Sequence, residues 1–232
     1  MTSTFTLPSI MKHPKANILC ALLLAAALPT LPALAQQHPP LPSKIQTGTA
    51  PKATAAPALA ATGKLTPLGD GSTVQSADGK LVWMRCNIGQ TYSNNQCQGD
   101  PKQMDQRDAA NEVKRMDLTG GYAGSTEWRL PTIEELQTLV YCEHGFSERQ
   151  QPVKLANAAA KNLPDSCKGD NYLRPTIDPV LFPNAAKDWV WSATPDLDRV
   201  VNMWAINFAS GAPAPIGRAN TQTAVRAVRN AK

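Results

Sequence analysis

Four basic side chains near the C-terminus are the residues of this sequence best suited to hold a charged ligand. They are Arg218, Arg226, Arg229 and Lys232. Guanidinium groups bind carboxylate and sulfate groups through paired, charge-assisted hydrogen bonds. We therefore predict that these four residues form the candidate ligand-binding patch, suited to an anionic partner. A solvated basic edge without a ligand is the alternative.

The acidic residues offer weaker chemistry. Asp188, Asp196 and Asp198 flank a Trp-rich segment and could bind Ca²⁺, but their spacing is not that of a calcium-binding loop. Glu134 and Glu135 are adjacent on an expected helix, so their side chains point about 100° apart and are poorly placed to act on one substrate. We predict no catalytic residue, no metal site and no cofactor.

The cysteines indicate disulfides. After Cys20 the chain holds four more, Cys86, Cys97, Cys142 and Cys167. An even number in an exported chain is typical of structural disulfides, and four cysteines allow three pairings. We predict the sequential pairing, since it closes two short loops, each worth roughly 3 kcal/mol. Zinc is disfavoured because there is no CxxC motif and only one His follows the N-terminal segments.

The N-terminal residues have the pattern of an export signal. Lys12 and Lys15 precede an apolar run over 18–28, and Ala33-Leu34-Ala35 is a small-x-small cleavage motif. We predict a signal peptide over 1–35. The apolar run is too short for a transmembrane helix, so no membrane anchor is expected after cleavage. The mature protein is then periplasmic, secreted or on the cell surface.

The remaining chain divides into two parts. Residues 36–63 are rich in Pro and Ala, lack aromatic residues and predict a disordered tether. Residues 64–232 have the length of one domain. Of the net charge of +5, only +1 belongs to this domain, which has 19 basic and 18 acidic residues. Nucleic-acid binding is therefore not expected, because it needs a concentrated basic face.

Local patterns predict the elements of the domain. Asp78-Gly79 predicts a hairpin turn between 73–75 and 81–84. Apolar periodicity predicts a helix over about 105–116, and Thr132 with Glu135 has the spacing of a capping box. Apolar and aromatic runs predict further strands, namely 189–191, 204–208 and 224–229. The expected class is α+β with two main helices and a mainly antiparallel sheet.

The segment Trp128-Arg129-Leu130-Pro131-Thr132, followed by Glu135, is the most distinctive of the sequence. Arg129 could bind an anion. It could instead form an internal ion pair or bind carbonyl oxygens to fix the turn before the helix. We predict the internal role, because an arginine between two large apolar residues is expected to be partly buried.

Together these segments resemble a known family. The order is an opening Leu81–Cys86, then Gly120-Gly121-Tyr122, the segment just described, Trp189–Thr194 and a closing Val225–Arg229. This order resembles the Lcl C-terminal domain family, a bacterial domain of unknown function named after a collagen-like adhesin. The Arg-Leu-Pro-Thr segment is also similar, at the level of fold, to the formylglycine-generating-enzyme and C-type-lectin-like group. The resemblance implies a compact C-type-lectin-like domain.

The resemblance also implies a function. It suggests a non-enzymatic surface or periplasmic domain for adhesion or for binding an anionic glycan or an envelope protein. Two alternatives stay open. One is an enzyme distantly related to the formylglycine-generating group, which would need a reactive cysteine pair or a metal. The other is a structural envelope subunit.

Overall fold

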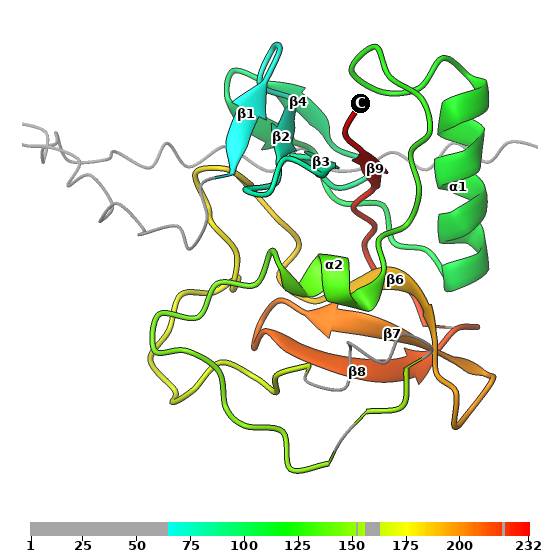
Figure 1. The fold of residues 1–232 in the computed structure, drawn as a ribbon. Coiled ribbons are helices and arrows are strands. Elements are labelled where there is room, and N and C mark those ends of the chain that lie inside the picture. Colours follow the sequence, from blue (N-terminus) through cyan, green and yellow to red (C-terminus); the bar gives the residue numbers. More distant parts are fainter. Residues whose placement is uncertain (1–64, 152, 156–162, 220) are drawn as a thin grey trace, which may run out of the picture. The chain divides into compact units, whose positions relative to one another are not determined.

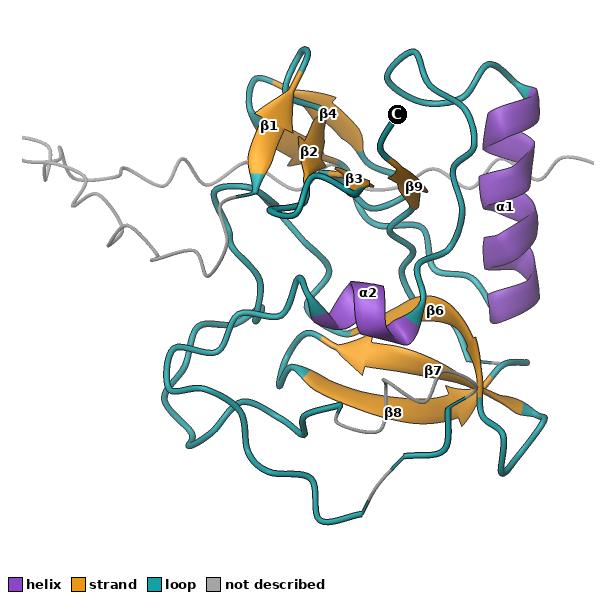
Figure 2. Ribbon diagram, viewed as in Figure 1, coloured by secondary structure: helices purple, strands orange, loops and turns teal. Residues whose placement is uncertain are grey.

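The computed structural model describes residues 65–151, 153–155, 163–219 and 221–232. The expected signal peptide and tether lie outside the described residues. Within them the chain forms three antiparallel sheets and two helices, so the predicted α+β class is confirmed (Figures 1 and 2). The strands are antiparallel, as predicted for the sheet, but they separate into three sheets where a single one was expected.

The first sheet has the order β1-β2-β3-β9. Its strands are β1 (Thr66–Leu68), β2 (Thr73–Gln75), β3 (Leu81–Met84) and β9 (Val228–Asn230). The predicted hairpin joins β2 to β3. Its turn is held by Ser76, whose hydroxyl donates to Asp78 at 2.6 Å and accepts from the Leu81 N–H at 2.9 Å. Gly79 has a φ of 72°, which glycine adopts without strain.

The other sheets are smaller. A two-stranded ribbon joins β4 (Thr91–Ser93) to β5 (Gln96–Gln98), and a three-stranded sheet has the order β6-β7-β8. The strands of the latter are β6 (Trp189–Pro195), β7 (Asn202–Asn207) and β8 (Ala212–Gly217).

The two helices begin where the sequence predicts. The first, α1 (Gln106–Leu118), is capped by Asp105, whose carboxylate accepts from the Asp108 N–H. The second, α2 (Ile133–Gln137), is short and begins after Thr132, with both hydrogen bonds of the capping box present. The main part of α2 lies against β6 and β7 (Figure 1).

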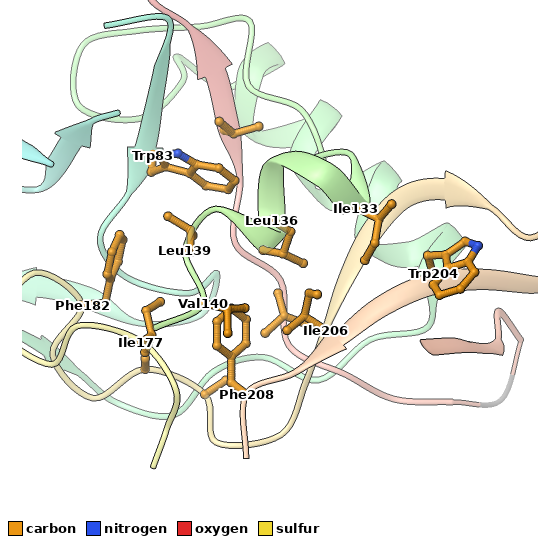
Figure 3. Packing of buried hydrophobic residues seen from close by; sticks show 14 of the residues in the cluster. Trp83, Ile133, Leu136, Leu139, Val140, Ile177, Phe182, Trp204, Ile206 and Phe208 are labelled. Carbon is orange, nitrogen blue, oxygen red and sulfur yellow. The ribbon is translucent and has the colours of Figure 1, made fainter. Parts of the chain in front are cut away.

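Alternate side chains of several strands enter two separate hydrophobic clusters. Trp83 and Ile206 belong to the first cluster, whereas Val82 and Ala205, next to them in sequence, belong to the second. These strands are therefore buried on both faces. The first cluster also takes up the apolar side of α2, and Figure 3 shows Ile133 and Leu136 facing Ile206. Trp204, Ile206 and Phe208, at every second position, all enter the first cluster.

The C-terminal segment 224–229 differs from its prediction. Only Val228–Asn230 form a strand, and the residues before it run between the clusters. Ala224 and Val228 enter the first cluster, while Val225 and Ala227 enter the second. Its backbone bonds are divided among three partners instead of forming one continuous ladder. The Ala227 carbonyl accepts from the Met84 N–H, the Val225 carbonyl from the Ile88 N–H and the Ala224 carbonyl from the Trp191 N–H.

Candidate functional site

The distinctive segment before α2 is held by an internal ion pair. The Arg129 guanidinium donates to both carboxylate oxygens of Glu135 at 2.7 Å, and also to the side chain of Asn230 at 3.2 Å. Glu135 accepts in addition from the Thr132 N–H at 2.8 Å. Arg129 therefore links α2 to the end of the chain at β9, which is the internal role expected from the sequence.

The surroundings of this pair shift both pKa values. Burial alone would raise the pKa of the Glu135 carboxyl, but the hydrogen bonds from Arg129 and from the Thr132 N–H outweigh it. This pKa therefore lies below its ordinary value. The hydrogen bond to Glu135 also raises the pKa of Arg129. Both groups are charged at neutral pH, and the pair is a structural contact within the fold.

Arg226 does not lie at the surface, and its predicted place in a ligand-binding patch is wrong. Its side chain is 1% exposed. The guanidinium donates to the carbonyls of Met84, at 2.7 Å, and of Arg85, and to the side chain of Asn87 at 3.0 Å. It also stacks 4.7 Å from the centre of the Phe182 ring. Burial lowers the pKa of Arg226 to about 9, so the side chain keeps its charge at pH 7.

A second interior arginine, which the sequence did not single out, has similar surroundings. Arg85 is 6% exposed and donates to the carbonyls of Leu181, Gly71 and Val180 at 2.6 to 2.8 Å. It also donates to the hydroxyl of Tyr92, whose ring it stacks on. These contacts tie the first sheet to the loop before β6. Neither Arg85 nor Arg226 has a carboxylate partner among the described residues.

Two other members of the predicted patch are engaged in local contacts. Arg229 lies over the Trp128 ring, 5.6 Å from its centre, and donates to the Asn230 carbonyl at 3.0 Å. Lys232 is exposed and lies 3.3 Å from a carboxylate oxygen of Glu127. Arg229 and Lys232 therefore lie near Trp128 and Glu127. Neither of them lines the cavity beside α1 to which Arg218 contributes.

Arg218 lines an open cavity of about 430 Å³ beside the start of α1. The N–H of Gln106 donates to the Arg218 carbonyl at 3.1 Å, which fixes the two segments together. Arg107 lines the same cavity, with the amide side chains of Gln106 and Asn111. Asp105 is also present, but its carboxylate caps the helix. In the part of the chain that the structure describes, the side chains of Arg107 and Arg218 have no hydrogen-bond or ion-pair partner.

The sequence analysis did not single out Arg107, although one feature of its position indicates a functional role. It stands in the first turn of α1, where the partial positive charge of the helix terminus disfavours a cation. A basic residue there does not serve the stability of the helix. Its proximity to Arg218 depends on a contact between segments far apart in the chain.

The acidic residues considered for calcium do not converge. Asp196 is buried and accepts from the Asp198 N–H at 3.0 Å and from the Asn202 amide at 3.3 Å. Asp198 pairs with Lys154 at 2.9 Å. Asp188 lines another cavity, of about 410 Å³, with the half-buried Trp189. Among the described residues, no group of three His, Cys, Asp or Glu side chains is placed to hold a metal ion.

The cysteines pair as the sequence predicted. Cys86 bonds to Cys97, and Cys142 bonds to Cys167. The first disulfide joins the end of the β3 region to β5, next to the backbone that Arg226 binds. The second fixes the loop after α2 against Gly211, whose missing side chain leaves room for the sulfur atoms. In the described part of the chain, no helix is long and apolar enough to cross a membrane.

The fold and these contacts define a class: an α+β domain with two disulfides, an interior braced by arginines and a small cationic cavity at its surface. Residues 72–229 match the Lcl C-terminal domain. The chain therefore belongs to the Lcl C-terminal domain family. Comparison with curated proteins and with solved structures gave no match.

Proposed function

We propose that the chain is exported through a signal peptide at 1–35 and acts as a non-enzymatic binding domain in the periplasm or at the cell surface. Its partner is an anionic glycan or an acidic envelope protein. The family, named after an adhesin, and the two disulfides support this proposal. A C-type-lectin-like relationship of the fold is part of the same hypothesis.

The cavity between Arg107 and Arg218 is the observation that carries the proposal. Two guanidinium groups that have no partner among the described residues can bind sulfate or carboxylate groups through forked hydrogen bonds. Gln106 and Asn111 add amide donors suited to sugar hydroxyls. The cavity is open and its neighbouring carboxylate is engaged in the helix cap, so a chain-like polyanion could pass along it.

The state of the cysteines supports a non-enzymatic role. All four cysteines of the domain are joined in disulfides, whereas a thiol-dependent enzyme of the formylglycine-generating kind would need a reactive cysteine. A structural envelope subunit would be recognised by a stable protein partner that co-purifies with the chain. The cationic cavity favours the binding domain over this alternative.

Heparin is a suitable first probe, because its sulfate and carboxylate groups represent the whole proposed ligand class. Calorimetric titration at low salt should show binding that weakens as salt increases. The double variant R107Q/R218Q should bind at least about tenfold more weakly, since each arginine contributes charge-assisted hydrogen bonds.

A matched control separates this site from net charge. K80Q/R115Q removes the same two charges at exposed positions that already have ion-pair partners. Its affinity for heparin should stay within about twofold of that of the unchanged chain. The loss of two positive charges outside the cavity weakens only the long-range attraction to heparin, which salt screens. Equal losses in both double variants would show non-specific attraction, and no binding of any polyanion or glycan would contradict the proposal.

A further inference from the structure

The loop between β6 and β7 presents aliphatic side chains to solvent. Leu197 is 51% exposed, Val200 77% and Val201 63%. These three, in a five-residue stretch, are half of the six large apolar side chains that are exposed among the described residues. Figure 2 shows this loop extending beyond the ends of its strands. We call residues 197–201 the tip loop.

The tip loop has a defined conformation. The Asn202 N–H donates to the Arg199 carbonyl at 2.8 Å, and the Arg218 N–H donates to the Val201 carbonyl at 2.9 Å. The buried carboxylate of Asp196 accepts from the Asp198 N–H at the base of the loop. The aliphatic side chains are therefore held outward by a turn whose polar groups are bonded internally.

The acidic side chains around the tip loop have partners within the protein, whereas two arginine side chains beside it have none among the described residues. Its acidic groups are engaged, because Asp196 is buried and Asp198 is paired with Lys154. The side chains of Arg199 and Arg218 are exposed and have no partner in the described part of the chain. The loop thus combines exposed aliphatic groups with free cations on the adjoining backbone.

We propose that the tip loop docks on the surface of a bilayer that contains anionic phospholipid. The aliphatic side chains enter the interfacial region, and Arg199 and Arg218 lie beside the headgroup phosphates. A stable protein interface buries roughly 800 Å² on each partner, far more than a five-residue loop supplies. A bilayer accepts a projecting loop without a complementary pocket. This peripheral contact goes beyond glycan binding and requires no membrane-spanning segment.

The test is flotation of the full chain with vesicles, either of phosphatidylcholine alone or of phosphatidylcholine mixed with phosphatidylglycerol. Binding should require phosphatidylglycerol and weaken with salt. V200S/V201S should bind about tenfold more weakly, because it removes apolar surface from the contact. R199Q/R218Q should lose roughly fivefold for each arginine. Hydrogen exchange in 196–202 should slow when mixed vesicles are added.

The control is L118S/V180S, which removes two exposed apolar side chains elsewhere (79% and 70% exposed). It should bind as the unchanged chain does. All variants share residues 1–64, so differences between them report on the tip loop. Equal binding by V200S/V201S, or unchanged exchange in 196–202, would overturn the proposal. The proposal would also be overturned if the chain bound no vesicles but formed a dimer, and if V200S/V201S dissociated that dimer.

The same variants separate this inference from the proposed glycan site. V200S/V201S should keep the heparin affinity of the unchanged chain, whereas R107Q/R218Q should lose it. Loss of vesicle binding in all forms, with heparin binding intact, would remove the bilayer contact alone. Vesicle binding without any heparin binding would remove the glycan proposal alone.

Discussion

Two regions of this domain use the same side chain in opposite ways. In the interior, Arg85 and Arg226 each donate to several backbone carbonyls and stack on an aromatic ring. At the edge beside α1, Arg107 and Arg218 line an open cavity and bind no group of the residues that the structure describes. The interior pair joins segments of the fold. The edge pair is left available, so a ligand is to be sought there.

The contrast shows how a buried cation is accommodated without a carboxylate. Carbonyl oxygens carry partial negative charge, and a guanidinium can satisfy several of them at fixed angles. For Arg226 these acceptors lie at the end of β3 and in the segment that follows it. The positive charge of this sequence is therefore partly a structural feature, and its total does not predict a binding surface.

The largest effect is expected for Arg226→Ala. The change leaves the carbonyls of Met84 and Arg85 unsatisfied in the interior and creates a cavity against Phe182. We expect a loss of about 3 to 5 kcal/mol in the free energy of unfolding, measured with urea. Arg226→Lys should lose less free energy of unfolding, because it keeps the positive charge. It should still be less stable than the unchanged chain, because an ammonium group lacks the planar set of donors of a guanidinium. If Arg226→Ala kept its stability and lost heparin binding instead, Arg226 would be a ligand-binding residue and not a structural one.

The next effect concerns the disulfide beside this interior site. Cys86–Cys97 spans 11 residues and fixes the backbone that Arg226 binds. C86S/C97S should lose about 3 kcal/mol, as expected for a loop of this size. Heparin affinity, measured where the variant is still folded, should not change. A selective loss of affinity at full stability would place the ligand near this disulfide.

A smaller effect, dependent on pH, is expected at Glu135. Since folding lowers the pKa of this carboxyl, the ionised form stabilises the fold above its unfolded pKa of about 4.5. This stabilisation is lost as the pH falls through the folded pKa. Urea unfolding of Glu135→Gln should therefore depend less on pH below about 4.5 than that of the unchanged chain.

Glu112 provides a comparison for that measurement. The hydrogen bond from Arg115 lowers the pKa of Glu112 to about 2, but Arg115 is 62% exposed. Solvent screens such a pair, so Glu112→Gln should cost little at pH 7. Added salt should remove most of the Glu112 effect and leave most of the Glu135 effect. The reverse order would mean that the segment before α2 is not held by its ion pair.

The smallest effect on stability is expected at the edge. R107Q/R218Q should have a free energy of unfolding within about 0.5 kcal/mol of that of the unchanged chain, because neither side chain has a partner to lose within the described part of the domain. Arg107→Gln alone should be neutral or slightly stabilising, since it removes a cation from the first turn of α1. Thermal unfolding with both disulfides intact is a suitable measurement. A loss of several kcal/mol would show that these arginines support the fold.

Local sequence signals predicted the parts of the fold that neighbouring residues control. The Asp78-Gly79 turn, the cap at Thr132 and the sequential disulfides involve short separations, and their chemistry is visible in the sequence. The division into three sheets was not predictable in this way. It depends on which distant strands pair, as when β9 joins β3.

The burial of Arg226 was within reach of the sequence. Val225 and Val228 fall on opposite faces of an extended segment, which indicates burial on both sides. An arginine between them is then expected to be internal, whereas its position near other basic residues favoured a surface patch. The sequence could not predict that Arg107 and Arg218 line the same cavity, because this depends on the contact between Gln106 and Arg218.

The most direct test of the account is to observe the arginine side chains themselves. Nuclear magnetic resonance of the Nε–H groups of the folded chain, recorded during titration with heparin, distinguishes the two regions in one experiment. The account predicts that the resonances of Arg107 and Arg218 shift with heparin, while those of Arg85 and Arg226 do not move. Shifts at Arg226 with none at Arg218 would contradict it.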